Sequence, residues 1–423
     1  MTRSATSHPP LLPADRRDTA FACGMFFFVL CAYYVLRPVR DEMAVRAGAA
    51  QLGWLFSATF VTMLCAAPLF GWVAARVATR WLAPCVLLFF ASHLLVFRFA
   101  LDASSLAVVA PHVFFVWISV FGLCTVSVFW SLVADRFPLA AAERLFGPIA
   151  VGGSAGAIAG PLLTSTLAAP LGIANLSLVS AALLVCATLC ALGLTRGWQA
   201  HPRSPDAPSR AALGGSAWEG FTLVARSPVL RLFCVYLVLH SLLGTVLYFE
   251  QTRLMATAFG SPAERTAFFA RIDLAVNVLT VVTQLFGVGP IVQRFGVAVA
   301  LALLPALSAL GFTALAIAPT FAVLVVFGVA RRAGEYAIAR PAREMLFTAL
   351  PRNVKYKAKN FLDTAVFRGA DAATSWIVEG ARAIGIVGGT VALAAVPMAL
   401  AGAFVGWRLG RDPGILDEEA ADR

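Results

Sequence analysis

The sequence is poor in charged residues for a chain of 423 residues. Aspartate, glutamate, lysine and arginine together make up 13% of it, whereas hydrophobic residues make up 60%. A soluble protein of this length carries about 25% charged residues. The composition therefore excludes an ordinary soluble domain and predicts a protein that crosses a membrane many times.

The sequence also lacks the patterns of catalytic, metal and cofactor sites. Its eight cysteines lie in or beside apolar runs, without the paired spacing or the histidine partners of a metal site. No phosphate loop of the form Gly-x4-Gly-Lys-Ser/Thr and no nucleophile–base pattern occurs. We therefore predict that the chain is not an enzyme and binds neither a metal nor a cofactor. Residues 1–18 lack the apolar core of a cleaved signal peptide, so the first span is expected to be retained.

Apolar segments long enough to span a bilayer form two groups of six, separated by a polar linker. The expected spans are 19–40, 51–75, 81–100, 105–133, 148–168, 171–195, 228–250, 265–289, 297–317, 319–345, 363–385 and 387–408. The predicted organisation is a tail at 1–18, a six-helix bundle at 19–196, a linker at 197–227, a second six-helix bundle at 228–408 and a tail at 409–423. The predicted fold class is thus an all-α polytopic membrane protein with two pseudo-symmetric halves.

Positive charge exceeds negative charge, with 33 lysines and arginines against 22 acids and a net charge of +11. When the N-terminus is placed inside, most arginines fall in loops on that side, as the positive-inside rule requires. We therefore expect both termini and the linker to be cytoplasmic, in a bacterial inner or plasma membrane. Because this bias explains much of the positive charge, the predicted partner is the lipid bilayer, with no nucleic acid and no evident obligate protein partner.

Two matching loops support a relationship between the halves. Gly71 and Arg76 in the first half, and Gly289 and Arg294 in the second, have the same Gly-x4-Arg spacing at the same topological place. This spacing resembles the loop signature of the major facilitator superfamily, without its usual acidic residue. The resemblance implies two six-helix bundles that rock about a site near the bilayer midplane. Glycines four residues apart in the fifth span (Gly152, Gly156, Gly160) predict close helix packing.

Residues 331–371 concentrate charge at membrane depth. A charged side chain at the centre of a spanning helix costs on the order of 3 kcal/mol, whereas an apolar residue contributes only about 0.5 kcal/mol. Arg331, Arg332, Arg340 and Arg343 would together outweigh most of the apolar gain of their own helix. These side chains must therefore face a water-filled cavity or one another.

The same pattern, Tyr-x3-Arg-Pro-x-Arg, occurs in the first and tenth spans. It places a tyrosine and two arginines on one helix face, and the proline removes a backbone hydrogen bond and bends the helix. Guanidinium groups bind phosphates bidentately and the tyrosine can stack on a ring, so we predict a site for an anionic ligand with a ring. Pairing of each arginine with an acid four residues later, Arg37 with Asp41 and Arg340 with Glu344, remains an alternative. The predicted substrate-binding residues are Tyr33, Arg37, Arg40, Tyr336, Arg340 and Arg343.

Four further residues are candidates for gating or for coupling to an ion. They are Glu250, Arg253, Asp273 and Asp371. Glu250 could close a gate with an arginine across the cavity or could carry a proton, and simple helix–helix pairing is the alternative for each residue. The chain's three lysines, Lys355, Lys357 and Lys359, form either a solvated loop or an electrostatic funnel for an anion.

These segments together resemble the nucleotide transporter (ATP/ADP translocase) family of plastids and intracellular bacteria. The resemblance runs nearly end to end and rests on YYVLRPVRDEMAV (33–45), SVFWSLVADRFPLAAAERLFG (127–147), YFEQTR (248–253) and EYAIARPAREMLFTALPRNVKYKAKNFLDTAVFRGAD (335–371). It implies that Arg40, Glu250 and Arg343 are critical for transport, with arginine where the family has lysine. The sequence departs from the family at 117–130, which contains no acid.

We therefore predict a secondary active transporter that exchanges nucleotides or related phosphorylated anions by alternating access. One alternative is a proton-coupled facilitator for another organic anion or a drug, with Glu250, Asp273 or Asp371 as the protonated group. A second alternative is a membrane scaffold or sensor that transports nothing.

Overall fold

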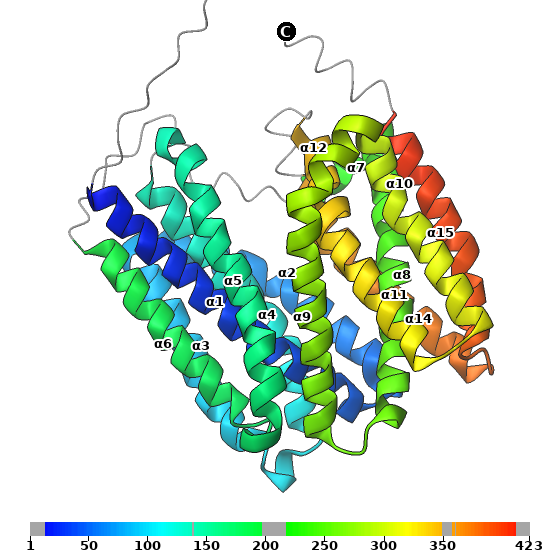
Figure 1. Cartoon of the computed structure of the whole chain (residues 1–423), viewed down its shortest axis with the longest axis horizontal. Helices are drawn as coiled ribbons and strands as arrows, with labels where there is room; N and C mark the ends of the chain where they lie inside the picture. The colour runs from blue at the N-terminus through cyan, green and yellow to red at the C-terminus, as the bar shows by residue number, and fades with distance from the viewer. Residues whose placement is uncertain (1–12, 138, 197–216, 349–357, 360, 412–423) are drawn as a thin grey trace, which may run out of the picture.

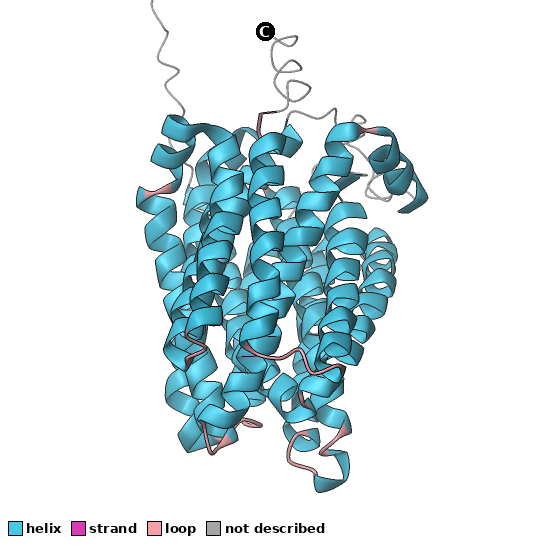
Figure 2. Ribbon diagram, turned by 90° about the vertical axis from the view of Figure 1, so that its right-hand side faces the viewer, coloured by secondary structure: helices cyan, strands magenta, loops and turns pink. Residues whose placement is uncertain are grey.

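The computed structural model describes residues 13–137, 139–196, 217–348, 358–359 and 361–411, and within these residues it contains helices and no strands (Figure 2). Ten helices of the described residues are long and apolar enough to cross a membrane. Two further segments complete a fold of twelve spans, and both belong to the charged stretch identified in the sequence. The charges that interrupt their apolar character mark them as segments that cannot face lipid all round.

The first half contains six long helices. They are α1 (Pro13–Ala47), α2 (Leu52–Arg76), α3 (Thr79–Ala100), α4 (Val109–Arg136), α5 (Leu139–Leu171) and α6 (Leu176–Thr195), with the short 3-10 turns η1 (Ala49–Gln51) and η2 (Ser104–Leu106) between them. These helices pack around one apolar core that includes Met25, Phe114, Phe121 and Phe129. The first six expected spans therefore correspond to six helices.

The second half begins with α7 (Ala217–Arg226) and then repeats the six-span arrangement. Its elements are α8 (Pro228–Ala258), α9 (Pro262–Phe286), α10 (Val288–Ile317), α11 (Phe321–Gly334), η4 (Glu335–Ala339), α12 (Arg340–Thr348), η5 (Leu362–Val366), α14 (Phe367–Ala383) and α15 (Gly389–Leu409). The tenth span consists of α11, η4 and α12, and the eleventh consists of η5 and α14. A glycine with positive φ, Gly296, breaks α10 near its start, where the sequence predicts the loop before the ninth span.

The expected tails and linker fall only partly on described residues. α1 begins at Pro13, inside the expected N-terminal tail, and α7 lies inside the expected linker. Residues 1–12, 197–216 and 412–423 lie outside the described residues, and so do Lys355 and Lys357 of the lysine segment.

The glycines of α5 let it approach α1 closely. A Cβ atom added at Gly152 would lie 2.4 Å from the carbonyl oxygen of Cys23, and one at Gly156 would lie 2.2 Å from that of Phe27. Since any side chain there would collide with backbone, the spacing of small residues serves helix packing, as the sequence predicts.

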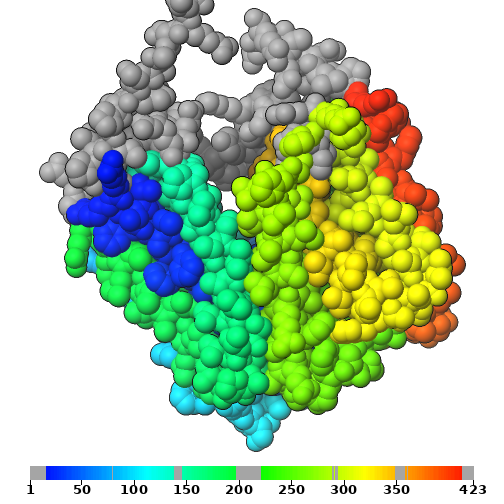
Figure 3. Space-filling model, viewed as in Figure 1, coloured from blue at the N-terminus to red at the C-terminus, as the bar shows by residue number. Residues whose placement is uncertain are grey.

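The two halves lie side by side, with α1–α6 on one side and α8–α15 on the other (Figures 1 and 3). The start of α1 and the end of α15 lie at the same end of the molecule, and α5 and α9 converge toward the opposite end (Figure 1). We call that opposite end the distal end. Asn277 of α9 donates a hydrogen bond to the carbonyl oxygen of Ala157 in α5 (2.6 Å), which joins the halves directly.

Both charged spans contain a π-helical turn. In the tenth span the turn is η4, which ends directly before Arg340 and Pro341, and in the eleventh it is η5. Proline lacks the N–H that would bond to the carbonyl oxygen four residues earlier, so the regular ladder is already interrupted at this point. π-turns of this kind occur frequently at functional sites.

Candidate functional site

Arg37 of α1 contacts two residues of the second half. Its Nη2 donates a hydrogen bond to the hydroxyl oxygen of Tyr336 (3.2 Å), and its Nε lies 3.9 Å from Oδ2 of Asp273. Asp273 of α9 also accepts a hydrogen bond from Arg332 of α11 (2.5 Å). The Asp273 side chain is only 1% exposed. One buried carboxylate is thus shared by an arginine from each half.

Tyr336 lies between arginines of both halves. The guanidinium carbon of Arg37 is 6.0 Å from the centre of its ring, and that of Arg340 is 5.9 Å from the same ring. Both distances allow a cation–π interaction. Arg340 is exposed, and no described residue forms an ion pair with it. The predicted residues Arg37, Tyr336 and Arg340 are therefore brought together.

Arg40 occupies a second contact between the halves. Its guanidinium group lies over the ring of Phe115 in α4, 4.2 Å from the ring centre, and its Nη1 is 3.8 Å from the Asp41 carboxylate. Asp41 accepts a hydrogen bond from the hydroxyl group of Tyr248 in α8 (3.0 Å). Tyr248 is not among the residues predicted from the sequence, because the acid two residues later, Glu250, is the residue of that segment that indicates gating.

The tenth span carries a third group of charges. Glu335 is 3.2 Å from Nη2 of Arg343 through one oxygen, and 2.7 Å from Nε2 of His240 in α8 through the other. Arg331, a buried residue, donates a hydrogen bond to the carbonyl oxygen of His240 (3.0 Å). Nothing in the local sequence links His240 to an acidic residue, and only helix packing brings it to the Glu335 carboxylate, 95 positions later.

The alternative of pairing within each helix is not seen in the described part of the chain. Asp41 contacts Arg40 and Tyr248 rather than forming an ion pair with Arg37. Glu344 forms its ion pair with Lys359 (2.5 Å) instead of Arg340. Arg37 and Arg340 are therefore not paired with the acid four residues later in their own helix.

The arginines around this site exceed the carboxylates that touch them. Among the described residues, four of these arginines lie within 4 Å of a carboxylate, Arg37 and Arg332 of Asp273, Arg40 of Asp41 and Arg343 of Glu335, whereas Arg331 and Arg340 form no ion pair. Six arginines thus face three carboxylates, a difference of three positive charges. The Nε atoms of Arg40, Arg331 and Arg332 are buried without a hydrogen-bond acceptor among the described residues. Buried donors are normally paired, so these groups suit an anionic ligand.

The remaining predicted residues lie in other surroundings. Glu250 accepts hydrogen bonds from Arg253 of its own helix (2.7 and 3.0 Å) and does not reach across the halves in this structure. Asp371 accepts hydrogen bonds from Ser241 and Thr245 (2.5 and 3.2 Å), which ties α14 to α8 within the second half.

Tyr33 and its neighbour Tyr34 take different places on α1. The ring of Tyr33 stacks on Phe121 of α4, with centres 6.3 Å apart and planes 25° apart, so it packs inside the first half. Tyr34 is the tyrosine next to Arg37, whose guanidinium carbon lies 5.7 Å from its ring centre. A separation of three residues on a helix brings Tyr34 and Arg37 together, a signal that could have been found in the sequence.

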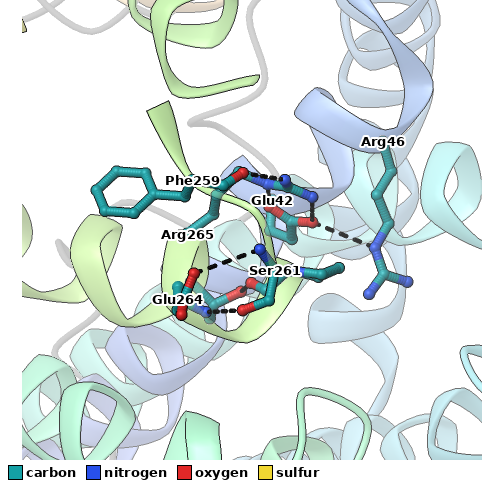
Figure 4. Close-up of polar contacts among 8 residues, drawn as sticks. Glu42, Arg46, Phe259, Ser261, Glu264 and Arg265 are labelled. Carbon is teal, nitrogen blue, oxygen red and sulfur yellow. Dashed lines mark hydrogen bonds and ion pairs between the residues drawn. The ribbon is translucent and has the colours of Figure 1, made fainter. Parts of the chain in front are cut away.

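Glu42 and Arg265 join the halves at the distal end (Figure 4). Arg265 of α9 donates two hydrogen bonds to the Glu42 carboxylate, each 2.8 Å long, and Arg46 donates a third (3.3 Å). The Glu42 side chain is 0% exposed, and that of Arg265 is 13% exposed. The first turn of α9 is fixed by a capping box, in which Ser261 and Glu264 exchange hydrogen bonds. A rigid helix start thus holds Arg265 against α1.

Comparisons with known proteins agree with this architecture. Residues 20–329 match the family model of the Major Facilitator Superfamily. The nucleoside transporter NupG has a similar structure, with 15% identity over 93% of this chain and 99% of that chain and a TM-score of 0.66. A peptide transporter of the POT family, crystallised with sulfate, has 15% identity over 97% of this chain and 96% of that chain and a TM-score of 0.62. A bacterial homologue of the human lysosomal transporter Spinster, in an inward-facing state, has 14% identity over 97% and 99% and a TM-score of 0.60.

A search of curated protein sequences finds no match. The family match covers well over half of the chain, and the solved structures share its fold over nearly their whole length. The chain therefore belongs to the Major Facilitator Superfamily and is a multi-pass membrane transporter of small molecules rather than an enzyme.

Proposed function

We propose that this transporter exchanges nucleotides such as ATP and ADP, or closely related phosphorylated anions, by alternating access. The observation that carries the proposal is the group of arginines from both halves whose buried Nε donors lack acceptors among the described residues. Phosphate oxygens are suitable acceptors because a guanidinium fork binds them bidentately. Tyr336, between Arg37 and Arg340, offers a ring face on which a base can stack.

The proposed site lies between the two halves, as alternating access requires for a substrate that moves across the membrane. Arg37 and Arg40 belong to the first half, whereas Arg332, Arg340 and Arg343 belong to the second. An anion bound to both sets would neutralise charges that repel one another when the halves close. The energy for transport would come from the gradient of the exchanged substrate, with both termini on the cytoplasmic side of a bacterial inner membrane.

Exchange of labelled ADP in proteoliposomes tests the proposal. We expect liposomes preloaded with unlabelled ATP or ADP to take up labelled ADP at least tenfold faster than empty liposomes. Arg343→Ala should remove this uptake, whereas Arg76→Ala should retain it, because Arg76 lies against Trp72 at the end of α2 (4.0 Å to the ring centre). Absence of uptake under every preload, from protein that remains monodisperse, would contradict nucleotide exchange.

A further inference from the structure

Glu335 is the counter-anion of a predicted substrate-binding arginine. It belongs to the π-helical turn η4, its side chain is 15% exposed, and one oxygen lies 3.2 Å from Nη2 of Arg343. The Arg343 side chain is 11% exposed, and no other described residue forms an ion pair with it. An anionic substrate that binds Nη2 of Arg343 therefore competes with Glu335 for this donor.

His240 offers Glu335 a second partner. Nε2 of His240 lies 2.7 Å from the other oxygen of Glu335, and the His240 side chain is 6% exposed. Imidazole is the side chain whose charge changes near neutral pH. A protonated His240 can therefore neutralise the charge of Glu335 when Arg343 binds the substrate anion instead. Glu335 is thus placed between a permanent cation and a titratable one.

The charges around this pair favour a coupled change. Without substrate, Arg343 pairs with Glu335 and Arg331 bonds to the carbonyl oxygen of His240, so this group carries one net positive charge when His240 is neutral. One negative charge bound at Arg343 together with one proton at His240 leaves the same net charge. A buried site resists a change in net charge because desolvated charge is costly, so the anion and the proton are expected to bind together.

Other titratable groups near His240 and Glu335 lie on α8, α14 and η5. Tyr236 precedes His240 by one turn of α8, with ring centres 6.2 Å apart. Asp371 of α14 is held by Ser241 and Thr245 of α8, with Arg368 3.9 Å away. Asp363 of η5 is within electrostatic range of Arg343. None of these groups contacts Glu335 among the described residues, so His240 is the titratable partner that does.

We propose that Glu335 pairs with Arg343 in the empty transporter. When the substrate binds, its anionic group replaces Glu335 at Arg343, and His240 takes up a proton. This inference rests on the proposed anion site and deepens it, because it makes His240 and Glu335 the positioning pair that links anion binding to proton uptake. Glu250, Asp273 and Asp371 have no part in that exchange. The proton passes from solvent to Nδ1 of His240, because Nε2, 2.7 Å from the Glu335 carboxylate, already carries its hydrogen; apart from this N–H bond, no covalent bond changes.

Two substitutions should shift anion affinity in opposite directions. The measurement is calorimetric titration of ADP into the purified full chain at pH 6 and pH 8. The wild type should bind ADP more tightly at pH 6 and take up about one proton per ADP. Glu335→Gln should bind about tenfold more tightly at pH 8 and lose the pH dependence, since a competing charged hydrogen bond is gone. His240→Gln should bind more weakly at pH 6 and also lose the pH dependence.

Two further readouts keep the inference separate from the proposed substrate. His112→Gln is the matched control, because the His112 ring hydrogen-bonds only to the carbonyl oxygen of Val108, directly before α4, among the described residues, and this variant should behave as the wild type. If ADP does not bind at all, the nucleotide proposal fails, and selective ¹⁵N-histidine NMR of the ligand-free chain still tests the pair. The His240 ring signals should shift on acidification and should also shift in Glu335→Gln. A His240 signal that neither titrates nor responds to Glu335→Gln would overturn the inference, as would equal effects of the two variants on ADP affinity.

Discussion

Replacing Arg37 with alanine is expected to lower kcat/KM for ADP exchange about 100-fold. Arg37 is the residue of the first half that reaches both Tyr336 and Asp273 of the second half. A charge-assisted hydrogen bond contributes about 1.5–3 kcal/mol, which corresponds to roughly 10- to 150-fold in rate when the contact persists in the transition state. Labelled ADP uptake into ATP-loaded proteoliposomes is the measurement.

Two controls separate a binding role from a structural one. Arg37→Lys keeps the charge but loses the bidentate fork, so it should retain about a tenth of the wild-type rate. Arg98→Ala removes an arginine that pairs with Asp102 and Asn175 inside the first half, and its rate should stay near that of the wild type. Wild-type exchange by Arg37→Ala would show that Arg37 serves packing between the halves and not the substrate.

Replacing Arg265 with glutamine is expected to open the distal end. The change leaves the fully buried Glu42 with Arg46 as its only cationic partner among the described residues. Removing one partner of a buried ion pair costs about 3 kcal/mol or more. This cost shifts the equilibrium constant between the two transport states by over a hundredfold. The state closed at the distal end, which this structure shows, should therefore lose population.

Distances between spin labels across the distal end measure this shift. Labels at Ser104→Cys, in the loop before α4, and Gly260→Cys, in the loop before α9, report on the two halves, in a background without the eight free cysteines. The mean distance should increase in Arg265→Gln and stay unchanged in Arg253→Gln, because Arg253 pairs with Glu250 of its own helix. Opening in Arg253→Gln alone would instead place the gate at Glu250.

The helices could be predicted from the sequence because each span is a local property. Apolar length indicates ten of them, and the charged stretch 331–371 indicates where the remaining two must face away from lipid. The glycines of α5 could likewise be assigned to packing, since close helix contact requires only small residues at the right spacing.

Contacts between distant helices could not be predicted in the same way. Glu42 and Arg265 are 223 positions apart, and nothing in either local sequence indicates the other. His240 meets Glu335 only because α8 packs beside η4. Glu250, in contrast, has an arginine three residues later on its own helix, and this near partner is the one it takes. The roles of the predicted site residues stay predictions until transport is measured.

The most direct test of the account is a comparison of adenosine, AMP and ADP as substrates of the wild-type chain. The central claim is that arginines of both halves recognise phosphate, with the ring contact at Tyr336 secondary. In ATP-loaded proteoliposomes we expect labelled ADP to exchange rapidly, AMP at least tenfold more slowly and adenosine not at all. Adenosine exchanging as fast as ADP would contradict the account, because the arginines would then contribute nothing to substrate choice.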